Sequence, residues 1–155
     1  MRRPVWFVDT SIFLNLLDIP GFSQDRERVV DDFRAKQKSG SLILPVAAVI
    51  ETGNHVAQLK NGLARREAAR KFGDALLLVS DGRAPWELNS SKWDDDFLHR
   101  LVSGGMTGLT LVEHAIRGVG CGDLSILVER EIYRERTGLS DVRIWTLDAK
   151  LAAHS

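Results

Sequence analysis

Residues 5–11 read VWFVDTS, a run of four apolar residues followed by an acid and two hydroxyl side chains. The run is rich in β-branched and aromatic residues, which favours a short buried strand. Asp9 is therefore expected at the C-terminal edge of that strand, where ligands bind in open α/β sheets. An acid at this edge is hard to explain by solubility alone.

Three further acids stand at the edges of apolar segments. Glu51 follows an apolar run, Asp123 opens another, and Asp148 closes a third near the end of the chain. Acids gathered at one edge repel one another unless a cation lies between them, and hard divalent cations prefer oxygen ligands. The four carboxylates together predict a metal site.

Each acid alone also has an ordinary structural explanation. Asp9 and Asp148 could be acids at helix N-termini, favoured by the helix dipole, and Asp123 could be a helix N-cap. Glu51 has the fewest such explanations, because an ionisable group among Ala, Val and Ile is costly to bury without a partner. The joint placement favours one metal site over coincidence.

Strand and helix patterns alternate along the chain. Strands are expected at residues 5–8, 42–44 and 142–146, each followed by helix, with one or two short strands between residues 76 and 122. With right-handed crossovers, this order predicts an α/β fold, a three-layer α/β/α sandwich with a central, mainly parallel sheet.

Length and composition set further limits. The 155 residues suggest one domain, 1–155, and the net charge of zero argues neither for nor against nucleic acid. Cys121 is the single cysteine, which excludes an internal disulfide. No stretch approaches the roughly 20 apolar residues of a membrane span, and Asp9 interrupts the first apolar run too early for a signal peptide. A cytoplasmic location away from membranes is expected.

The four acids resemble those of PIN-domain nucleases in order and setting. The resemblance is carried by VDTS at residues 8–11, Glu51 in the next strand–helix unit, Asp123 opening a late helix, and TLD at residues 146–148. Each motif alone is weak, whereas four in the right order over nearly the whole chain form a strong signal.

The resemblance implies a metal-dependent endoribonuclease, most often the toxin of a type II toxin–antitoxin pair of the VapC type. It implies that Asp9, Glu51, Asp123 and Asp148 are catalytic and bind Mg²⁺ or Mn²⁺, that RNA is the substrate, and that a small antitoxin protein is the partner. Homodimers are also common in this family.

Two other functions compete with this hypothesis. One is a non-catalytic or housekeeping PIN-like module that binds or processes RNA. The other is a phosphotransferase with Asp9 as nucleophile. Such haloacid-dehalogenase sites normally place a second acid two residues later, where this chain has Ser11.

Hydroxyl groups flank two of the acids. Thr10 and Ser11 follow Asp9, and Thr146 precedes Asp148 by two residues. They could orient an acid, a metal-bound water or the substrate, as outer-shell partners of metal sites do. One of the first two could equally cap the following helix, and Thr146 could simply be a strand residue.

A basic segment and a histidine remain. Residues 60–71 carry five basic side chains against one acid, and could contact an RNA backbone or form a solvated helix face. His55 lies one helical turn after Glu51, where a half-buried structural role is favoured over a metal or phosphate contact. Residues 83–120 match no motif. The basic side chains proposed for RNA are Arg65, Arg66, Arg70 and Lys71.

Overall fold

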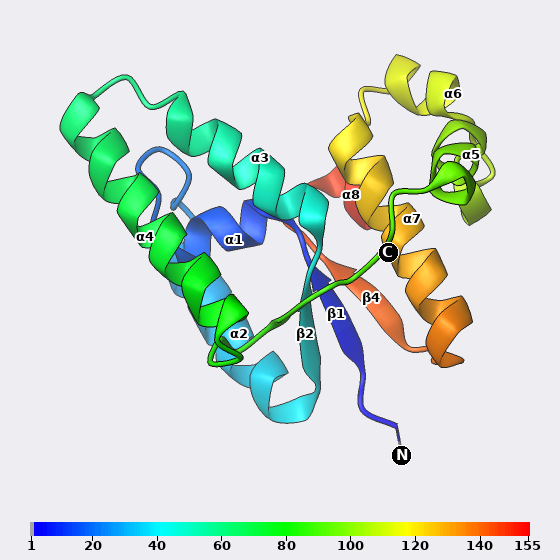
Figure 1. Cartoon of the computed structure of the whole chain (residues 1–155), viewed down its shortest axis with the longest axis horizontal. Helices are drawn as coiled ribbons and strands as arrows, with labels where there is room; N and C mark the ends of the chain where they lie inside the picture. The colour runs from blue at the N-terminus through cyan, green and yellow to red at the C-terminus, as the bar shows by residue number, and fades with distance from the viewer. Residues whose placement is uncertain (1) are drawn as a thin grey trace.

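The structure, a computed structural model, describes residues 2–155 and contains a four-stranded sheet between layers of helices (Figure 1). The strands follow the order β3-β2-β1-β4, and every neighbouring pair is parallel. The predicted α/β sandwich with a parallel sheet is confirmed. The strands are β1 (Val5–Val8), β2 (Ser41–Leu44), β3 (Glu87–Leu88) and β4 (Val142–Trp145).

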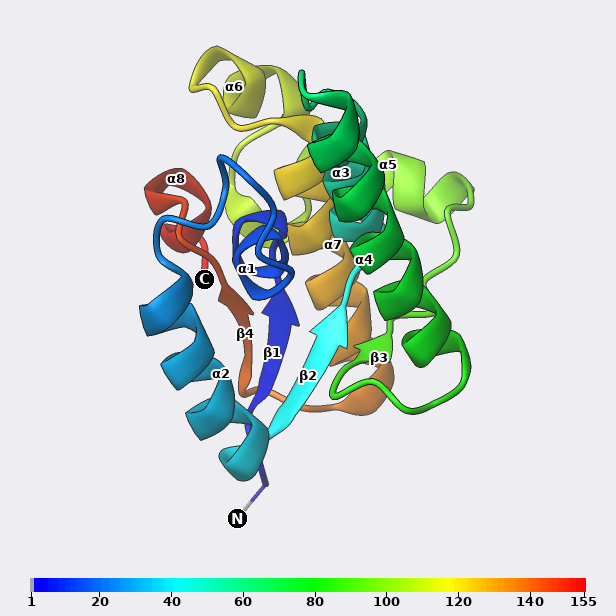
Figure 2. The ribbon, with the colours of Figure 1, turned by 90° about the vertical axis from the view of Figure 1, so that its left-hand side faces the viewer.

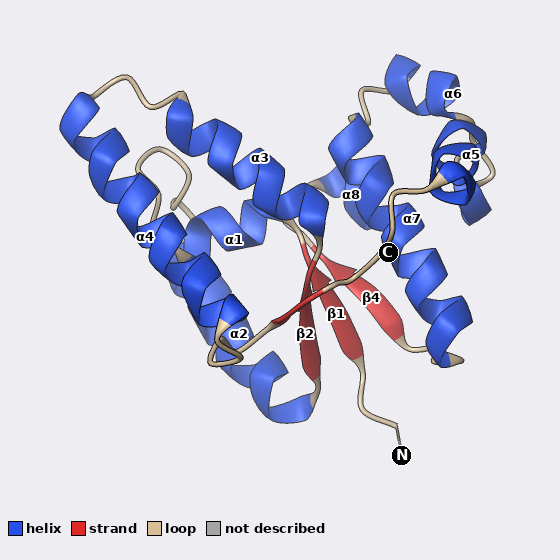
Figure 3. Ribbon diagram, in the orientation of Figure 1, coloured by secondary structure: helices blue, strands red, loops and turns tan. Residues whose placement is uncertain are grey.

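Helices cover both faces of this sheet (Figure 3). Figure 2 shows the strands side by side, with α2 and α4 in front of them. The helices are α1 (Thr10–Leu16), α2 (Arg26–Ser39), α3 (Val46–Ala57), α4 (Gly62–Ser80), α5 (Asp95–Ser103), the 3-10 turn η1 (Gly105–Thr107), α6 (Leu111–Ile116), α7 (Cys121–Thr137) and α8 (Ala149–Ala152). None of those helices combines the length and the apolar character that a bilayer crossing requires.

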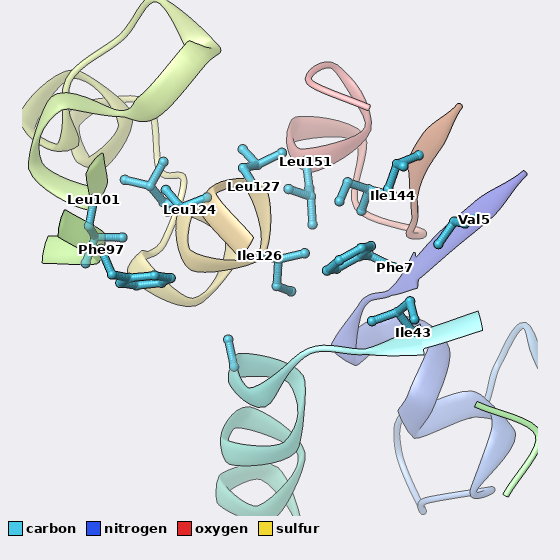
Figure 4. Packing of buried hydrophobic residues seen from close by; sticks show 13 residues of the cluster. Val5, Phe7, Ile43, Phe97, Leu101, Leu124, Ile126, Leu127, Ile144 and Leu151 are labelled. Atoms are coloured by element: carbon cyan, nitrogen blue, oxygen red, sulfur yellow. The ribbon is translucent and has the colours of Figure 1, made fainter. Parts of the chain in front are cut away.

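Strand β1 separates two hydrophobic cores because its side chains alternate between the faces of the sheet. Trp6 and Val8 pack with residues of α1 and α2 on one face. Val5 and Phe7 pack with residues of α5, α7 and α8 on the other. Figure 4 shows Phe7, which is fully buried, in the middle of this second core. Burial of such a side chain contributes about 1.5–3 kcal/mol, so β1 and the loop after it are firmly placed.

Residues 83–120, which the sequence left without a role, hold α7 in place. The segment forms β3, α5, η1 and α6. Asn89 donates a hydrogen bond of 3.0 Å from Nδ2 to Oε2 of the fully buried Glu129 on α7. Arg100 of α5 forms ion pairs with Glu131 at 3.0 Å and Glu135 at 2.8 Å. These contacts position the helix whose first turn carries Asp123.

Candidate metal centre

Asp9 is the N-cap of α1, and its two carboxylate oxygens have different surroundings. Oδ2 accepts hydrogen bonds from the Ser11 hydroxyl at 2.8 Å and the Thr146 hydroxyl at 2.7 Å. Oδ1 is buried and has no hydrogen-bond partner among the described residues. Such an atom costs free energy unless something binds it, so one oxygen is anchored and the other is left for a ligand.

Two further carboxylates approach Asp9 from other helices. Glu51 comes from α3 and Asp123 from the first turn of α7. One oxygen from each of the three acids lies within 4.8 Å of the other two. Oxygen ligands at about 2.0–2.6 Å from a shared divalent cation are at most about 5 Å apart, so the three acids fit a hard cation.

Gly122 makes room for Glu51. A Cβ added at Gly122 would overlap Oε1 of Glu51, at a separation that real Cβ atoms do not show. The other oxygen, Oε2, accepts a hydrogen bond of 2.8 Å from the Thr10 hydroxyl. Glycine at position 122 therefore lets the carboxylate of Glu51 lie against the start of α7. Gly122 was not predicted as a site residue, and its only signal in the sequence is the glycine-rich connection at residues 118–122.

Asp148 is not part of the closely spaced cluster formed by Asp9, Glu51 and Asp123. Its Oδ1 accepts a hydrogen bond of 2.9 Å from the Lys150 amide, so it caps α8. Among the described residues, only the other three acids meet the spacing for a shared cation. Asp148 still lines the same cavity, which has a volume of about 380 Å³. A metal contact of Asp148 stays a prediction.

The hydroxyls beside the acids link the loops after β1 and β4. Ser11 Oγ accepts a hydrogen bond from the Leu147 amide at 3.0 Å, and Thr146 Oγ1 accepts one from the Asp148 amide at 2.9 Å. Both hydroxyls then donate to Asp9. The backbone after β4 therefore helps to hold the Asp9 carboxylate in position through these two hydroxyls.

Two helix starts differ from the sequence interpretation. Asp9 caps α1, so neither Thr10 nor Ser11 does. Helix α7 begins at Cys121 with Gly120 as its N-cap, which places Asp123 in the first turn. The glycine cap carries no polar side chain, so the sequence contained no signal for this earlier start.

The crystal structure of FitAcB from Neisseria gonorrhoeae is similar to this chain, with a TM-score of 0.61 and 16% sequence identity. The match covers 96% of this chain and 91% of that chain, and FitB is a PIN-domain protein. The fold of this chain is PIN-like. At this identity, the similarity establishes the fold alone. No protein-family model and no curated protein sequence matches the chain.

The neighbouring acids of this PIN-like fold act on the ionisation of Asp123. The pKa of Asp123 is raised to about 7, first by burial and then by the negative charges of Asp9, Glu51 and Asp148. A cation among these carboxylates would reverse that effect, because it favours their ionised forms. Both the charges of these acids and their oxygen donors therefore fit a bound metal ion.

Without metal, the contribution of Asp123 to the stability of the PIN-like fold is expected to fall as pH rises from about 4 to about 7. Over this range the folded protein retains a proton on Asp123 that the unfolded chain has released, so the free energy of unfolding decreases with pH. Asp123 is only half-buried, and we expect an effect of about 1–2 kcal/mol after solvent screening.

Urea unfolding in EDTA at several pH values measures this effect. Asp123→Asn should flatten the dependence, whereas Asp141→Asn, at the opposite end of β4, should retain it. Equal pH dependence in wild type and Asp123→Asn would contradict the assignment. Titrating groups outside the cluster of acids, such as the buried Glu129, remain in both proteins and cancel in the comparison.

The basic side chains proposed for RNA lie on α4, outside the cavity. All four are exposed, and within residues 2–155 none of them pairs with a carboxylate. Lys71 Nζ donates a hydrogen bond of 3.4 Å to the carbonyl of Asp18, in the segment between α1 and α2. An RNA contact of these side chains, Arg65, Arg66, Arg70 and Lys71, stays a prediction.

Proposed function

We propose that this protein is a metal-dependent endoribonuclease, formed by a single PIN-like domain over residues 1–155, that hydrolyses RNA phosphodiester bonds. The observation that carries the proposal is the unpartnered Oδ1 of Asp9, buried beside carboxylate oxygens of Glu51 and Asp123. Three oxygen donors from separate elements suit Mg²⁺ or Mn²⁺, which act in many enzymes that cleave phosphodiesters.

A bound Mg²⁺ or Mn²⁺ would supply Lewis acidity and an activated water for attack on phosphorus. Asp9, Glu51 and Asp123 would hold the ion. Ser11 and Thr146 keep Asp9 Oδ1 directed at the cluster, since both donate to Oδ2.

Asp148 and the Thr10 hydroxyl have separate proposed roles. Thr10 fixes Glu51 through the hydrogen bond to Oε2. Asp148 uses Oδ1 for the α8 cap, and its Oδ2 would orient a water molecule or accept its proton. Asp148 would thus act as a catalytic residue at the cavity wall.

The similar structure also supports a proposal for the biological role of this protein. FitB is a VapC-type toxin of a toxin–antitoxin system. By analogy, this protein would be a toxin whose partner is a small antitoxin protein, and it would form a homodimer. Growth arrest on expression, relieved by the product of a neighbouring gene, tests the toxin role. Normal growth despite active enzyme would favour housekeeping RNA processing.

The nuclease activity itself is tested with purified protein and RNA. Cleavage is expected with Mg²⁺ or Mn²⁺, and EDTA should abolish it. Asp123→Asn should lower the rate by on the order of 100-fold or more, because even partners that only orient metal ligands typically cost 10–100-fold. Asp141→Asn serves as the control and should cleave normally. A folded protein that cleaves no RNA with either metal would contradict the proposal and favour a non-catalytic module.

A further inference from the structure

Two aromatic rings share the cavity with the carboxylates. Phe22, between α1 and α2, and His55, on α3, both line it. Their ring centroids are 4.7 Å apart and their planes are inclined by 52°. Both side chains are only half-buried, so part of each ring remains accessible. His55 lies one helical turn after Glu51, which brings the ring pair next to the cluster of acids.

The segment that carries Phe22 is held firmly. Asn15, which is 4% exposed, donates from Nδ2 to the Ser11 carbonyl at 2.8 Å and accepts from the Asp25 amide at 3.1 Å. The fully buried Ile19 packs with Leu14 and with residues of α3 and α4. The fold therefore fixes the position of Phe22 at the cavity, although its ring is not enclosed.

Positive charge lies next to the same segment. The hydrogen bond from Lys71 Nζ to the Asp18 carbonyl places this one cation of α4 against it. Grooves that bind single strands combine these two features, cations for the phosphates and aromatic rings for the bases.

We propose that Phe22 and His55 form a subsite for an unpaired nucleobase next to the bond that is cut, an inference that rests on the proposed nuclease function. A base stacks on the accessible part of the rings, and no described residue hydrogen-bonds to the ring nitrogens of His55, which leaves them to contact the base edge. Bases inside a duplex are stacked on each other and are not available for such contacts. The pair thus makes the site selective for unpaired nucleotides.

Binding of a short labelled single-stranded RNA, measured by fluorescence anisotropy, tests the subsite. The proteins carry Asp9→Asn so that the strand stays intact. Phe22→Leu, which keeps an apolar side chain but removes the ring, should weaken binding roughly 5- to 150-fold, the range for loss of one stacked base. Phe22→Tyr should bind normally. Phe72→Leu is the matched control, because Phe72 packs against the same core but does not line the cavity.

A second series of RNA strands identifies which base occupies the subsite. Single abasic nucleotides are placed at each position in turn, and at one position the loss should match that of Phe22→Leu. With that strand, Phe22→Leu should cause no further loss, since contacting groups are not additive. Equal weakening of the intact strand and every abasic strand by Phe22→Leu would overturn the subsite, as would no weakening of either.

Failure of the nuclease proposal gives a different result. Phe22-dependent binding by a wild-type protein that does not cleave would contradict the nuclease and support the base subsite. Cleavage with the same kcat/KM in wild type and Phe22→Leu would overturn the subsite while supporting the nuclease.

Discussion

Asp9→Asn is expected to abolish metal binding and RNA cleavage while leaving the metal-free protein at least as stable as wild type. Three hydrogen-bond donors point at Oδ2, from the Ser11 amide, the Ser11 hydroxyl and the Thr146 hydroxyl. An asparagine must present its oxygen to them, which turns its NH₂ group toward Glu51 and Asp123. An amide NH₂ cannot ligate a cation, so we expect Mn²⁺ affinity to fall at least about 100-fold.

The stability part of this expectation has an electrostatic cause. The charge of Asp9 raises the pKa of Asp123, so its removal relieves repulsion in the metal-free cluster. Isothermal titration with Mn²⁺ and urea unfolding in EDTA measure the two effects. Asp25→Asn is the control, because Asp25 lines the same cavity outside the cluster. Retained Mn²⁺ affinity in Asp9→Asn would remove Asp9 from the metal centre.

Of the substitutions that add a single methyl group near the site, Gly122→Ala is expected to be the most damaging. The new Cβ would overlap Oε1 of Glu51. Either Glu51 leaves the cluster and its hydrogen bond from Thr10, or the start of α7 shifts and moves Asp123. The first outcome should lower Mn²⁺ affinity about 10- to 100-fold, and the second should cost about 1–3 kcal/mol of stability as overpacking does.

Gly120→Ala provides the matched control two residues earlier. No atom lies within 4 Å of a Cβ at Gly120, and its φ of −73° is ordinary for alanine. We expect normal Mn²⁺ binding and a stability change within about 1 kcal/mol, since alanine caps helices less well than glycine. If Gly122→Ala and Gly120→Ala bind Mn²⁺ with equal affinity and unfold at equal urea concentrations, Gly122 does not serve to accommodate Glu51.

The sequence was sufficient to assign three acids to one site, and each acid stood out for its own reason. Residues after parallel strands meet at one edge of the sheet, which placed Asp9. Glu51 stood out because its apolar neighbours gave it few ordinary roles. Asp123 stood out because it opens an apolar segment, and the family resemblance assigned it to the same site, although α7 starts two residues before it. The fold followed from the alternation of strand and helix, and it agrees with the observed parallel sheet.

Other features depend on contacts that a sequence does not display. Strand β3 has two residues, Glu87 and Leu88, both exposed, so it lacks the pattern of a buried strand. Gly122 matters only because a helix from a distant part of the chain brings Glu51 against it. No motif in the sequence marks Phe22, because its place beside His55 arises from the packing of Ile19 and the hydrogen bonds of Asn15.

The hydroxyl of Thr146 reaches Asp9 across 137 positions of the chain. During translation at about 5–20 residues per second, the two residues are made roughly 7–27 s apart. Asp9 and Glu51 therefore leave the ribosome long before the groups that orient and complete their cluster. A nascent chain would therefore lack an assembled cluster of acids until α7 and β4 have emerged.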